Sequence, residues 1–347
     1  MSFYANFEKT IGSFHLNVHL EGGNETIALL GPSGCGKSMT LKCIAGLETP
    51  DRGRITLDGT VLFDSEQKIN LPPQQRNTGF MFQNYALFPH MTVFQNVYTG
   101  ACQFKDRRKR TEFSNSILNR FGLNELSERL PDQLSGGQQQ GVALARMLAS
   151  QPAILLLDEP FSALDRHLRF QMEQEIRGIL KEYGKTAVLV SHDRDEVYRM
   201  STKTAVMEYG SVAEFGATSD IFSSPKTVAS AILTGCRNVS PVRIVSENKV
   251  FAIDWGIELE IPVTKLTPDF VGIRSEDICF GSAENSFICR VTDEIEDLSC
   301  CTRMLRPNVC AEGAPLVWTL SKELRNRTKS EVVEIHIPKN RILLLHS

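Results

Sequence analysis

Short apolar runs alternate with stretches of helical periodicity over the first two thirds of the chain. Residues 14–20, FHLNVHL, alternate apolar and polar positions, which is the period of a half-buried strand. Continuous apolar runs, typical of strands buried on both faces, lie at 27–30, 78–82, 154–157 and 186–190. Residues 111–130 and the stretch from Gln138 carry apolar positions at helical spacing. The pattern predicts an α/β domain.

The pattern changes at about residue 236 to short strand-like runs separated by turn-forming residues. These runs lie at 242–245, 250–253, 257–263, 287–291 and 331–337. Short strands at this spacing predict a small β-barrel, similar to an OB-fold. A length of 347 residues also favours two domains. We expect a first, α/β domain at 1–235, with a helical subdomain at about 84–150, and a dimerising or regulatory β-rich accessory domain at 236–347.

The apolar run at 27–30 leads into GPSGCGKS, which fits G-x-x-x-x-G-K-[ST] at every fixed position. Glycines let backbone N–H groups approach a polyphosphate, and the following helix points its positive end at the same anion. Lys37 is expected to reach the β- and γ-phosphates, and Ser38 to be a ligand of Mg²⁺. The predicted ATP-contacting residues of this segment are Gly31, Pro32, Ser33, Gly34, Cys35, Gly36, Lys37, Ser38 and Met39. A chance glycine-rich turn is disfavoured by the strand and helix patterns on its two sides.

Two carboxylates follow the apolar run at 154–157. An apolar strand that ends in aspartate is where a P-loop ATPase places its second magnesium ligand, so Asp158 is expected to take that role. Glu159 is expected to orient or deprotonate the attacking water. Carboxylates at a strand end can also be simple helix caps, but the glycine loop favours the catalytic interpretation.

Aromatic side chains precede the glycine loop, and one of them is expected to stack on adenine. The candidates are Tyr4, Phe7 and Phe14, and a core role is open for each. Phe14 is the predicted stacking residue.

Composition excludes some function classes. The net charge of −3 lacks the positive excess that is typical of nucleic-acid-binding proteins. The basic cluster at 105–110 is expected to be a solvated loop or helix start. No apolar run is long enough to span a bilayer, and the first residues lack a secretory pattern. Nine cysteines without zinc-ligand spacing favour free thiols in a reducing cytoplasm.

Together these motifs resemble the nucleotide-binding subunit of ABC transporters over residues 1–235. Gln83 matches the Q-loop glutamine, LSGGQ at 134–138 the signature, and ILLLDEP at 154–160 the strand with its carboxylates. Residues 162–165 resemble the D-loop, which ends in Asp165, and His192 resembles the switch histidine. Six motifs in the family's order make the resemblance specific.

The resemblance implies a mechanism. Such subunits form head-to-tail dimers that enclose two ATP molecules, with the P-loop of one copy facing the signature of the other. The signature residues expected to face the nucleotide are Ser135, Gly136, Gly137 and Gln138. His192 would contact the γ-phosphate, and Gln83 would sense Mg²⁺ and link to the membrane subunits. The resemblance also implies a peripheral position on the cytoplasmic face of the membrane, integral permease subunits and an extracytoplasmic solute-binding protein.

The transported solute is expected to be an oxyanion. The segment TIGSFHLNVHL and residues 234–238, 254–256 and 271–278 look most like the molybdate, tungstate and sulfate importers. Importers of sugar, polyamine or iron are the alternative. A DNA-repair ATPase is disfavoured because only about fifty residues, without sustained heptads, separate Gln83 from Ser135.

Two further expectations concern the helical subdomain. Gly141 stands where the family usually has arginine, so Gly141→Arg is expected to raise ATPase activity or stability. The apolar side chains of Tyr85, Leu87, Phe88 and Met91 are expected to receive a helix of the membrane subunit, with packing inside the subdomain as the alternative for each.

Overall fold

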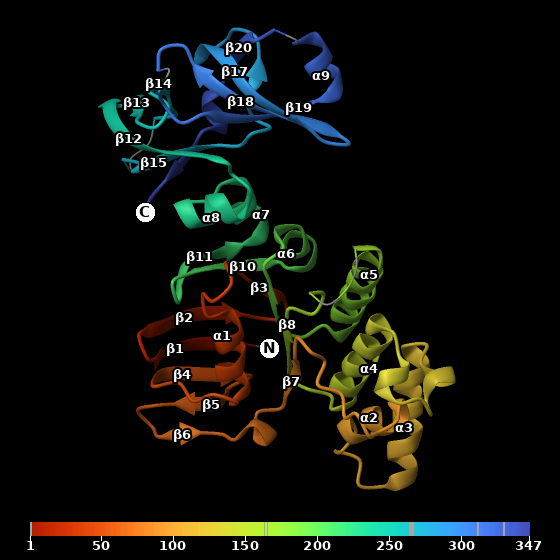
Figure 1. Ribbon diagram of the computed structural model, residues 1–347. Helices are drawn as coiled ribbons and strands as arrows, with labels where there is room; N and C mark the ends of the chain where they lie inside the picture. Colours follow the sequence, from red (N-terminus) through yellow and green to blue (C-terminus); the bar gives the residue numbers. More distant parts are fainter. Residues whose placement is uncertain (1, 163, 165, 264–266, 311, 329) are drawn as a thin grey trace. The chain divides into compact units, whose positions relative to one another are not determined.

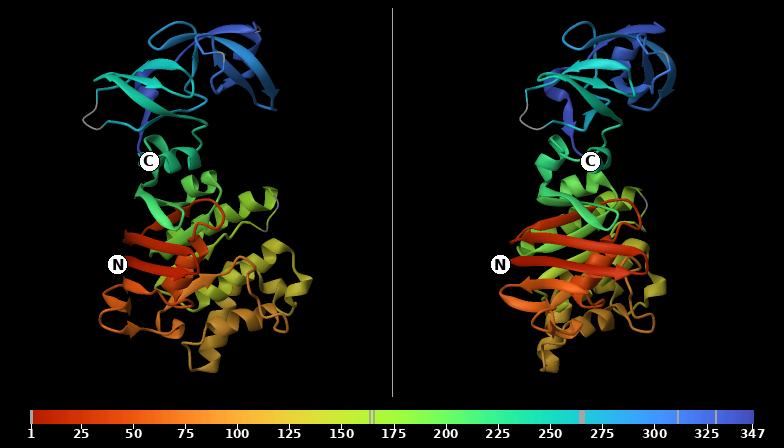
Figure 2. Two further views of the ribbon diagram at one scale, coloured as in Figure 1. Left: turned by 60° about the vertical axis from the view of Figure 1, so that its left-hand side comes forward. Right: turned by 90° about the vertical axis from the view of Figure 1, so that its left-hand side faces the viewer.

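The computed structural model describes residues 2–162, 164, 166–263, 267–310, 312–328 and 330–347 (Figures 1 and 2). The chain forms two compact units that divide between Ser219 and Asp220. The sequence placed this boundary later, at residue 235. The intervening segment contains helix α8 (Val228–Leu233), whose buried Ala231 packs with Cys236 and Leu345. Its apolar contacts assign α8 to the C-terminal unit.

One eleven-stranded sheet forms the framework of the first unit. Its strands are β1 (Phe3–Ile11), β2 (Phe14–Gly22), β3 (Thr26–Leu30), β4 (Arg52–Leu57), β5 (Thr60–Asp64), β6 (Ile69–Asn70), β7 (Thr78–Met81), β8 (Ile154–Asp158), β9 (Ala187–Ser191), β10 (Lys203–Glu208) and β11 (Ser211–Ala217). Their order across the sheet is β6-β5-β4-β1-β2-β11-β10-β3-β9-β8-β7. The half from β10 to β7 is parallel, whereas the half from β6 to β2 is antiparallel.

The parallel half has the continuous apolar sequences that such sheets require. β3, β8 and β9 read TIALL, ILLLD and AVLVS, and all their side chains except that of Thr26 are buried. In register, Leu30 lies opposite Ser191, and Asp158 lies opposite Val190. Because parallel strands end at the same edge, the loops that follow β3, β7, β8 and β9 meet there.

Helices cover this sheet and form a separate helical subdomain (Figure 1). The α-helices of the first unit are α1 (Lys37–Ala45), α2 (Val93–Gly100), α3 (Arg107–Arg120), α4 (Gly136–Ala149), α5 (Arg166–Tyr183) and α6 (Arg194–Met200), and α7 (Thr218–Ser223) crosses the boundary. Short 3₁₀ segments lie at η1 (Pro73–Gln75), η2 (Asn124–Leu126) and η3 (Pro131–Gln133). α2, α3 and α4 share one apolar core, to which Val97, Leu118 and Val142 contribute.

The helix predicted at 111–130 is α3, which begins and ends earlier. Asp106 caps it, because its carboxylate accepts hydrogen bonds from the N–H groups of Arg108 and Lys109. Gly122, with φ of 62°, turns the chain after the helix. The basic cluster at 105–110 is therefore a helix start, as predicted.

Arg76 fixes the C-terminal end of α1. Its side chain is 1% exposed, and Nη1 donates hydrogen bonds of 2.8 and 2.9 Å to the carbonyl oxygens of Cys43 and Ile44. Nε and Nη2 donate to Leu71 O and Asn70 Oδ1. A cation at this end complements the helix dipole, although burial lowers the pKa of Arg76. The contact holds the helix that follows the glycine loop.

The second unit contains two five-stranded sheets. Its elements are β12 (Asn238–Ser246), β13 (Lys249–Ala252), β14 (Ile257–Glu260), β15 (Phe270–Ile273), β16 (Cys279–Phe280), β17 (Ser286–Glu296), β18 (Cys300–Pro307), β19 (Leu316–Ser321), α9 (Lys322–Arg327), β20 (Val332–His336), η4 (Lys339–Arg341) and β21 (Leu343–Leu345). The sheet orders are β14-β13-β12-β15-β21 and β16-β20-β17-β18-β19. Both sheets contribute to one core around Trp255 and Trp318. The β-rich accessory domain that the sequence predicted thus consists of two sheets on a shared core.

The sequence predicted no membrane-spanning helix and predicted free thiols. None of the described helices is long and apolar enough to cross a bilayer. All nine cysteines are free thiols, and Cys301 of the vicinal pair is buried, as expected of a small apolar side chain.

Gly141 has room for a larger side chain. It lies buried in α4, where an added Cβ would meet only the Leu123 side chain, at 3.9 Å. Glycine inside a helix costs about 1 kcal/mol relative to alanine. We predict that Gly141→Ala raises the free energy of unfolding by about 0.5–1 kcal/mol, measured by urea denaturation. The alanine variant is also the control for Gly141→Arg, because an arginine effect no larger than the alanine effect would exclude a contribution from the guanidinium.

Candidate active site

The glycine loop between β3 and α1 forms one wall of a cavity of about 450 Å³. The lining residues are Ile11, Phe14, Ser33, Gly34, Gly36, Lys37, Ser38, Met39, Gln83 and Glu159. Gly36 has a φ of 105°, and an added Cβ would lie 2.6 Å from Leu16 Cδ1, so only glycine fits there. Lys37 is 5% exposed, and Nζ donates 2.8 Å hydrogen bonds to the carbonyl oxygens of Gly31 and Pro32. The loop thus concentrates N–H groups and one ammonium around the cavity.

Phe14 and Ile11 form the apolar part of the same cavity. They are partners across the turn between β1 and β2, and Ile11 is 42% exposed. The Phe14 ring packs beside Gly36, where an added Cβ would come within 3.2 Å of it. The sequence suggested Phe14 as the adenine-stacking residue but missed Ile11. The sequence could have indicated Ile11, because this residue lies opposite Phe14 across a two-residue turn.

Ser38 and Asp158 meet across the loops that follow β3 and β8. Ser38 Oγ donates a 2.7 Å hydrogen bond to Asp158 Oδ1. Burial raises the pKa of Asp158, although the hydrogen bond from Ser38 lowers it. The hydroxyl, which lines the cavity, and the carboxylate behind it both carry hard oxygen atoms that can be ligands of a divalent cation.

The donor set fits a magnesium ion that arrives with a nucleotide. The described residues hold no group of three His, Cys, Asp or Glu side chains that could bind a metal alone. Nucleotide-bound Mg²⁺ needs no such group, because phosphates and water supply most of its oxygen ligands. Ser38, Asp158 and the Gln83 side-chain oxygen are the predicted protein ligands, and Gln83 lines the cavity.

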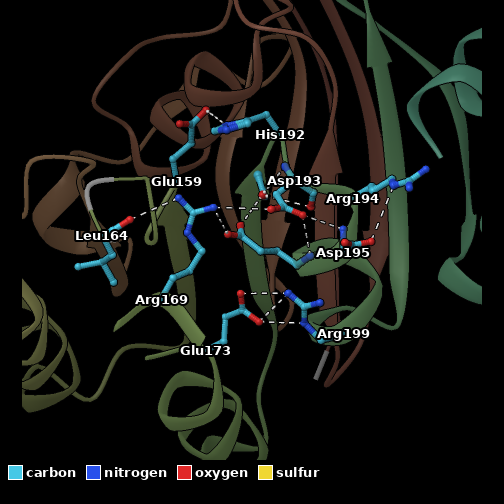
Figure 3. A network of polar contacts seen from close by, with 11 residues as sticks. Glu159, Leu164, Arg169, Glu173, His192, Asp193, Arg194, Asp195 and Arg199 are labelled. Carbon is cyan, nitrogen blue, oxygen red and sulfur yellow. Dashed lines mark hydrogen bonds and ion pairs between the residues drawn. The ribbon is translucent and has the colours of Figure 1, made fainter. Parts of the chain in front are cut away.

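Glu159 and His192, which directly follow β8 and β9, form a pair (Figure 3). Glu159 Oε1 lies 3.4 Å from His192 Nδ1. Glu159 has a φ of 45°, which a residue with a side chain rarely adopts, and its N–H donates to Val190 O on the neighbouring strand. The sheet therefore holds Glu159 in a strained conformation that directs its carboxylate toward His192.

Charged residues of α5 hold the helix that follows His192. Glu173 forms a two-pronged ion pair with Arg199, at 2.9 and 3.1 Å (Figure 3). One turn earlier, Arg169 Nη1 lies 3.7 Å from Asp193 and 3.8 Å from Glu196. Glu196 is buried, and burial raises its pKa. These contacts, which the sequence analysis missed, fix α6 and hence the position of His192.

Arg146 of α4 holds the segment that follows Gln83. Tyr85 and Ala86 have φ values of 60° and 44°, two consecutive left-handed residues with side chains. Arg146 donates to both carbonyl oxygens, at 3.0 Å for Tyr85 and 2.8 Å for Ala86. Its guanidinium also lies 5.1 Å from the centre of the Phe88 ring. The sequence analysis assigned no role to Arg146, because a lone arginine in an apolar helix pattern does not indicate which distant segment it contacts.

The signature segment has the features of a strong helix start but does not line this cavity. Ser135 and Gln138 form a reciprocal capping box at the beginning of α4. Ser135 and Gly136 are exposed, and neither they nor Gly137 and Gln138 are among the described residues that line the cavity. In the D-loop segment, Ser162 Oγ donates to Glu159 O at 3.0 Å, whereas the predicted residue Asp165 lies outside the described residues.

A glycine loop between a parallel strand and a helix, with serine, aspartate and glutamate at the same sheet edge, defines a P-loop ATPase. The family model described as ABC transporter matches residues 15–162. The Fe(3+) ions import ATP-binding protein FbpC of Brucella abortus is 42% identical over 249 residues, which cover 70% of this chain and 68% of that protein. The chain belongs to the ABC transporter family, as an ATP-binding and ATP-hydrolysing member.

Other similar proteins support the same family. The spermidine/putrescine import ATP-binding protein PotA of Nitratidesulfovibrio vulgaris is 42% identical over 237 residues, covering 67% of this chain and 62% of that protein. The ATP-binding cassette MJ0796, a dimer bound to ADP and Pi, has a TM-score of 0.54 at 29% identity, covering 63% of this chain and 99% of that chain. The protein cbiO1 of Clostridium perfringens, part of the ABC transporter complex cbiONQ, has a TM-score of 0.56 at 28% identity, covering 64% of this chain and 90% of that chain.

The apolar wall makes a testable contribution to base binding. Base–aromatic stacking is worth about 1–3 kcal/mol, so Phe14→Ala should weaken ATP binding by about 5- to 150-fold. Ile11→Ala should weaken it less. The affinity of inorganic tripolyphosphate, measured by calorimetry as a control, should not change. An equal loss of affinity for tripolyphosphate would contradict a role at the base.

The raised pKa of Asp158 predicts opposite effects on stability and activity. Since the folded pKa lies above the ordinary value of 3.8, the folded protein binds this proton more tightly, and the carboxyl's stabilising contribution falls as pH rises through that interval. Asp158→Asn keeps an acceptor for Ser38 without the charge. At pH 7.5 we expect an unchanged or higher melting temperature without nucleotide, but ATP turnover at least about a hundredfold lower. A lower melting temperature or retained turnover would contradict this account.

Proposed function

We propose that the chain is the ATPase subunit of an importer and lies peripherally at the cytoplasmic face of the membrane. Its partners would be a second copy of the chain, integral permease subunits and, indirectly, an extracytoplasmic solute-binding protein. The observation that carries the proposal is one cavity lined by the glycine loop, Ser38 and Glu159, with Asp158 hydrogen-bonded to Ser38 and His192 paired with Glu159. The relatives named as import proteins support the direction of transport.

Each residue has a role in this proposal that follows from its chemistry. Lys37 and the loop N–H groups bind the phosphates, while Phe14 and Ile11 bind the base. Ser38, Gln83 and Asp158 would hold Mg²⁺, which neutralises phosphate charge when bound. Glu159 orients the attacking water and accepts its proton.

His192 completes the hydrolytic pair. Its Nδ1 lies 3.4 Å from Glu159 Oε1, so the imidazole orients the carboxylate while the other ring nitrogen remains able to contact the γ-phosphate. The α5 contacts to α6 hold the imidazole at this distance. The proposed hydrolytic step therefore depends on a preorganised pair on rigid elements.

A second copy would complete the site. Within one chain, the described lining of the cavity leaves out the signature residues, although Ser135 and Gly136 are exposed at a helix start. In a head-to-tail dimer, Ser135, Gly136, Gly137 and Gln138 of the partner would face the γ-phosphate. Asp165 would lie at the same interface, by resemblance to the D-loop. The similar cassette MJ0796 is a dimer, which supports this arrangement.

The solute is proposed to be ferric iron. The oxyanion that the sequence predicted finds no support in the similar importer proteins, whose names specify Fe(3+) or spermidine and putrescine. Iron is supported by the Brucella relative and by a Haemophilus influenzae protein that is 42% identical over 225 residues. Polyamine is the second candidate, because the PotA relative has the same identity.

The test is stimulated ATP hydrolysis by the chain assembled with its permease subunits in lipid vesicles. Binding proteins loaded with ferric iron, spermidine or molybdate are added in turn, with Glu159→Gln as the inactive control. Stimulation by the ferric protein alone supports the proposal. Stimulation by the spermidine- or molybdate-loaded protein would keep the importer and replace the solute, and equal turnover in Glu159→Gln would contradict the catalytic assignment.

The proposed permease contact depends on Phe88. Of the four side chains predicted for this surface, Tyr85 is 6% exposed and belongs to an internal core, which corrects its assignment, whereas Phe88 is 46% exposed. The Phe88 backbone is held on both sides by Asn96, so its side chain can change without loss of the segment's fold.

We predict that Phe88→Asp abolishes assembly with the permease, because it places a charge in an apolar contact. ATP affinity and melting temperature should stay unchanged. Co-purification from membranes measures assembly, and calorimetry measures ATP affinity. Loss of ATP binding in this variant would instead assign Phe88 to the core of the subdomain.

A further inference from the structure

The start of α3 carries an unusual concentration of positive charge. Residues 105–120 contain six Lys or Arg side chains and two carboxylates, a net charge of +4 on a chain whose net charge is −3. Lys105, Arg107, Arg108 and Lys109, here called the α3 basic cluster, are all exposed.

A structural contact accounts for Arg110, the residue that follows the α3 basic cluster. Arg110 lies 4.0 Å above the Tyr98 ring and donates to Tyr98 O, so it ties α3 to the end of α2. Arg108 pairs with Glu112 at 3.1 Å, but both side chains are more than half exposed, which makes the pair weak. In the described part of the chain, the side chains of Lys105, Arg107 and Lys109 form no ion pair or hydrogen bond.

The α3 basic cluster is also electrostatically unfavourable for the helix that carries it. The first turn of a helix has a partial positive charge, which favours Asp and Glu and disfavours Lys and Arg. α3 has no acidic residue in its first turn, so the capping residue Asp106 and the exposed Glu112 offset only part of the positive charge. Local arrangements that work against folding are expected at functional sites.

The location of the cluster suggests which surface it meets. α3 packs beside α2 in the helical subdomain, and Arg110 connects their ends (Figure 1). α2 follows directly on the segment around Phe88, which the proposed function assigns to the permease. The inference rests on that proposal, because it requires that a permease bound at Phe88 place this subdomain beside the cytoplasmic surface of the bilayer.

We propose that the α3 basic cluster binds the anionic phospholipid headgroups of the cytoplasmic leaflet. Each Lys or Arg near such a surface gains about 1 kcal/mol, or about fivefold in affinity, over roughly a Debye length. The cytoplasmic loops of membrane proteins are themselves rich in Lys and Arg, so they would repel the cluster, whereas anionic lipid attracts it. The contact orients the subdomain at the membrane and adds to the permease contact.

The test measures binding of the purified full chain to sedimenting vesicles of phosphatidylcholine, with or without 30% phosphatidylglycerol. The variant K105E/R107E/K109E replaces the three cations without ion pairs. Glutamate is favoured in the first turn, so the melting temperature should be unchanged or higher. The control R177E/K181E/R237E makes the same charge change at three exposed positions elsewhere.

We expect the wild-type chain and the control to bind anionic vesicles at least tenfold better than neutral ones, and 0.5 M salt to remove the difference. The cluster variant should lose this preference while its ATPase activity stays unchanged. No preference in the wild type, or an equal loss in the control, would overturn the proposal. Unchanged vesicle binding with lost assembly on detergent-solubilised permease would assign the cluster to a protein partner and also overturn it. Failure of the importer proposal itself would appear separately, as no solute-stimulated turnover in the wild-type complex.

Discussion

The parallel register of β7, β8, β9 and β3 is the constraint on which the site depends. Their apolar sequences can be buried only in a sheet covered on both faces, and that sheet brings four strand ends to one edge. The same burial leaves Asp158 partly desolvated and raises its pKa. The raised pKa of Asp158, next to the nucleotide cavity, is therefore a direct consequence of the fold.

Strained backbone and partly buried ion pairs surround this edge. Glu159, Tyr85 and Ala86 are held in left-handed conformations, and each is fixed by a hydrogen bond to a neighbouring element. Arg146 joins the proposed permease-facing segment to the helix that begins at the signature. Arg169 and Glu173 join α5 to the helix that follows His192. These contacts give the proposed partner surfaces a physical connection to the residues proposed for hydrolysis.

The sequence predicted the parts of the protein that have local signals. The glycine loop and the buried strands were evident from period and spacing, because residues 27–38 specify a strand, a turn and a helix start together. The domain boundary was placed later than the division in the structure because α8 is apolar and short, and contacts with Cys236, Leu345 and His346 place it in the second unit. Ile11, Arg146 and Arg169 were missed, since their roles come from contacts between residues distant in the sequence. The transported solute could not be predicted from the motifs, because they specify ATP chemistry and not the solute.

The measurement that tests the central claim most directly is the sedimentation of Glu159→Gln with and without ATP and Mg²⁺. The account holds that one chain supplies only part of each nucleotide site. It predicts a monomer without nucleotide, a dimer with saturating ATP, and a monomer with ATP when Ser135→Arg is added to block the signature surface. A Glu159→Gln chain that binds ATP with full occupancy and remains a monomer would contradict it.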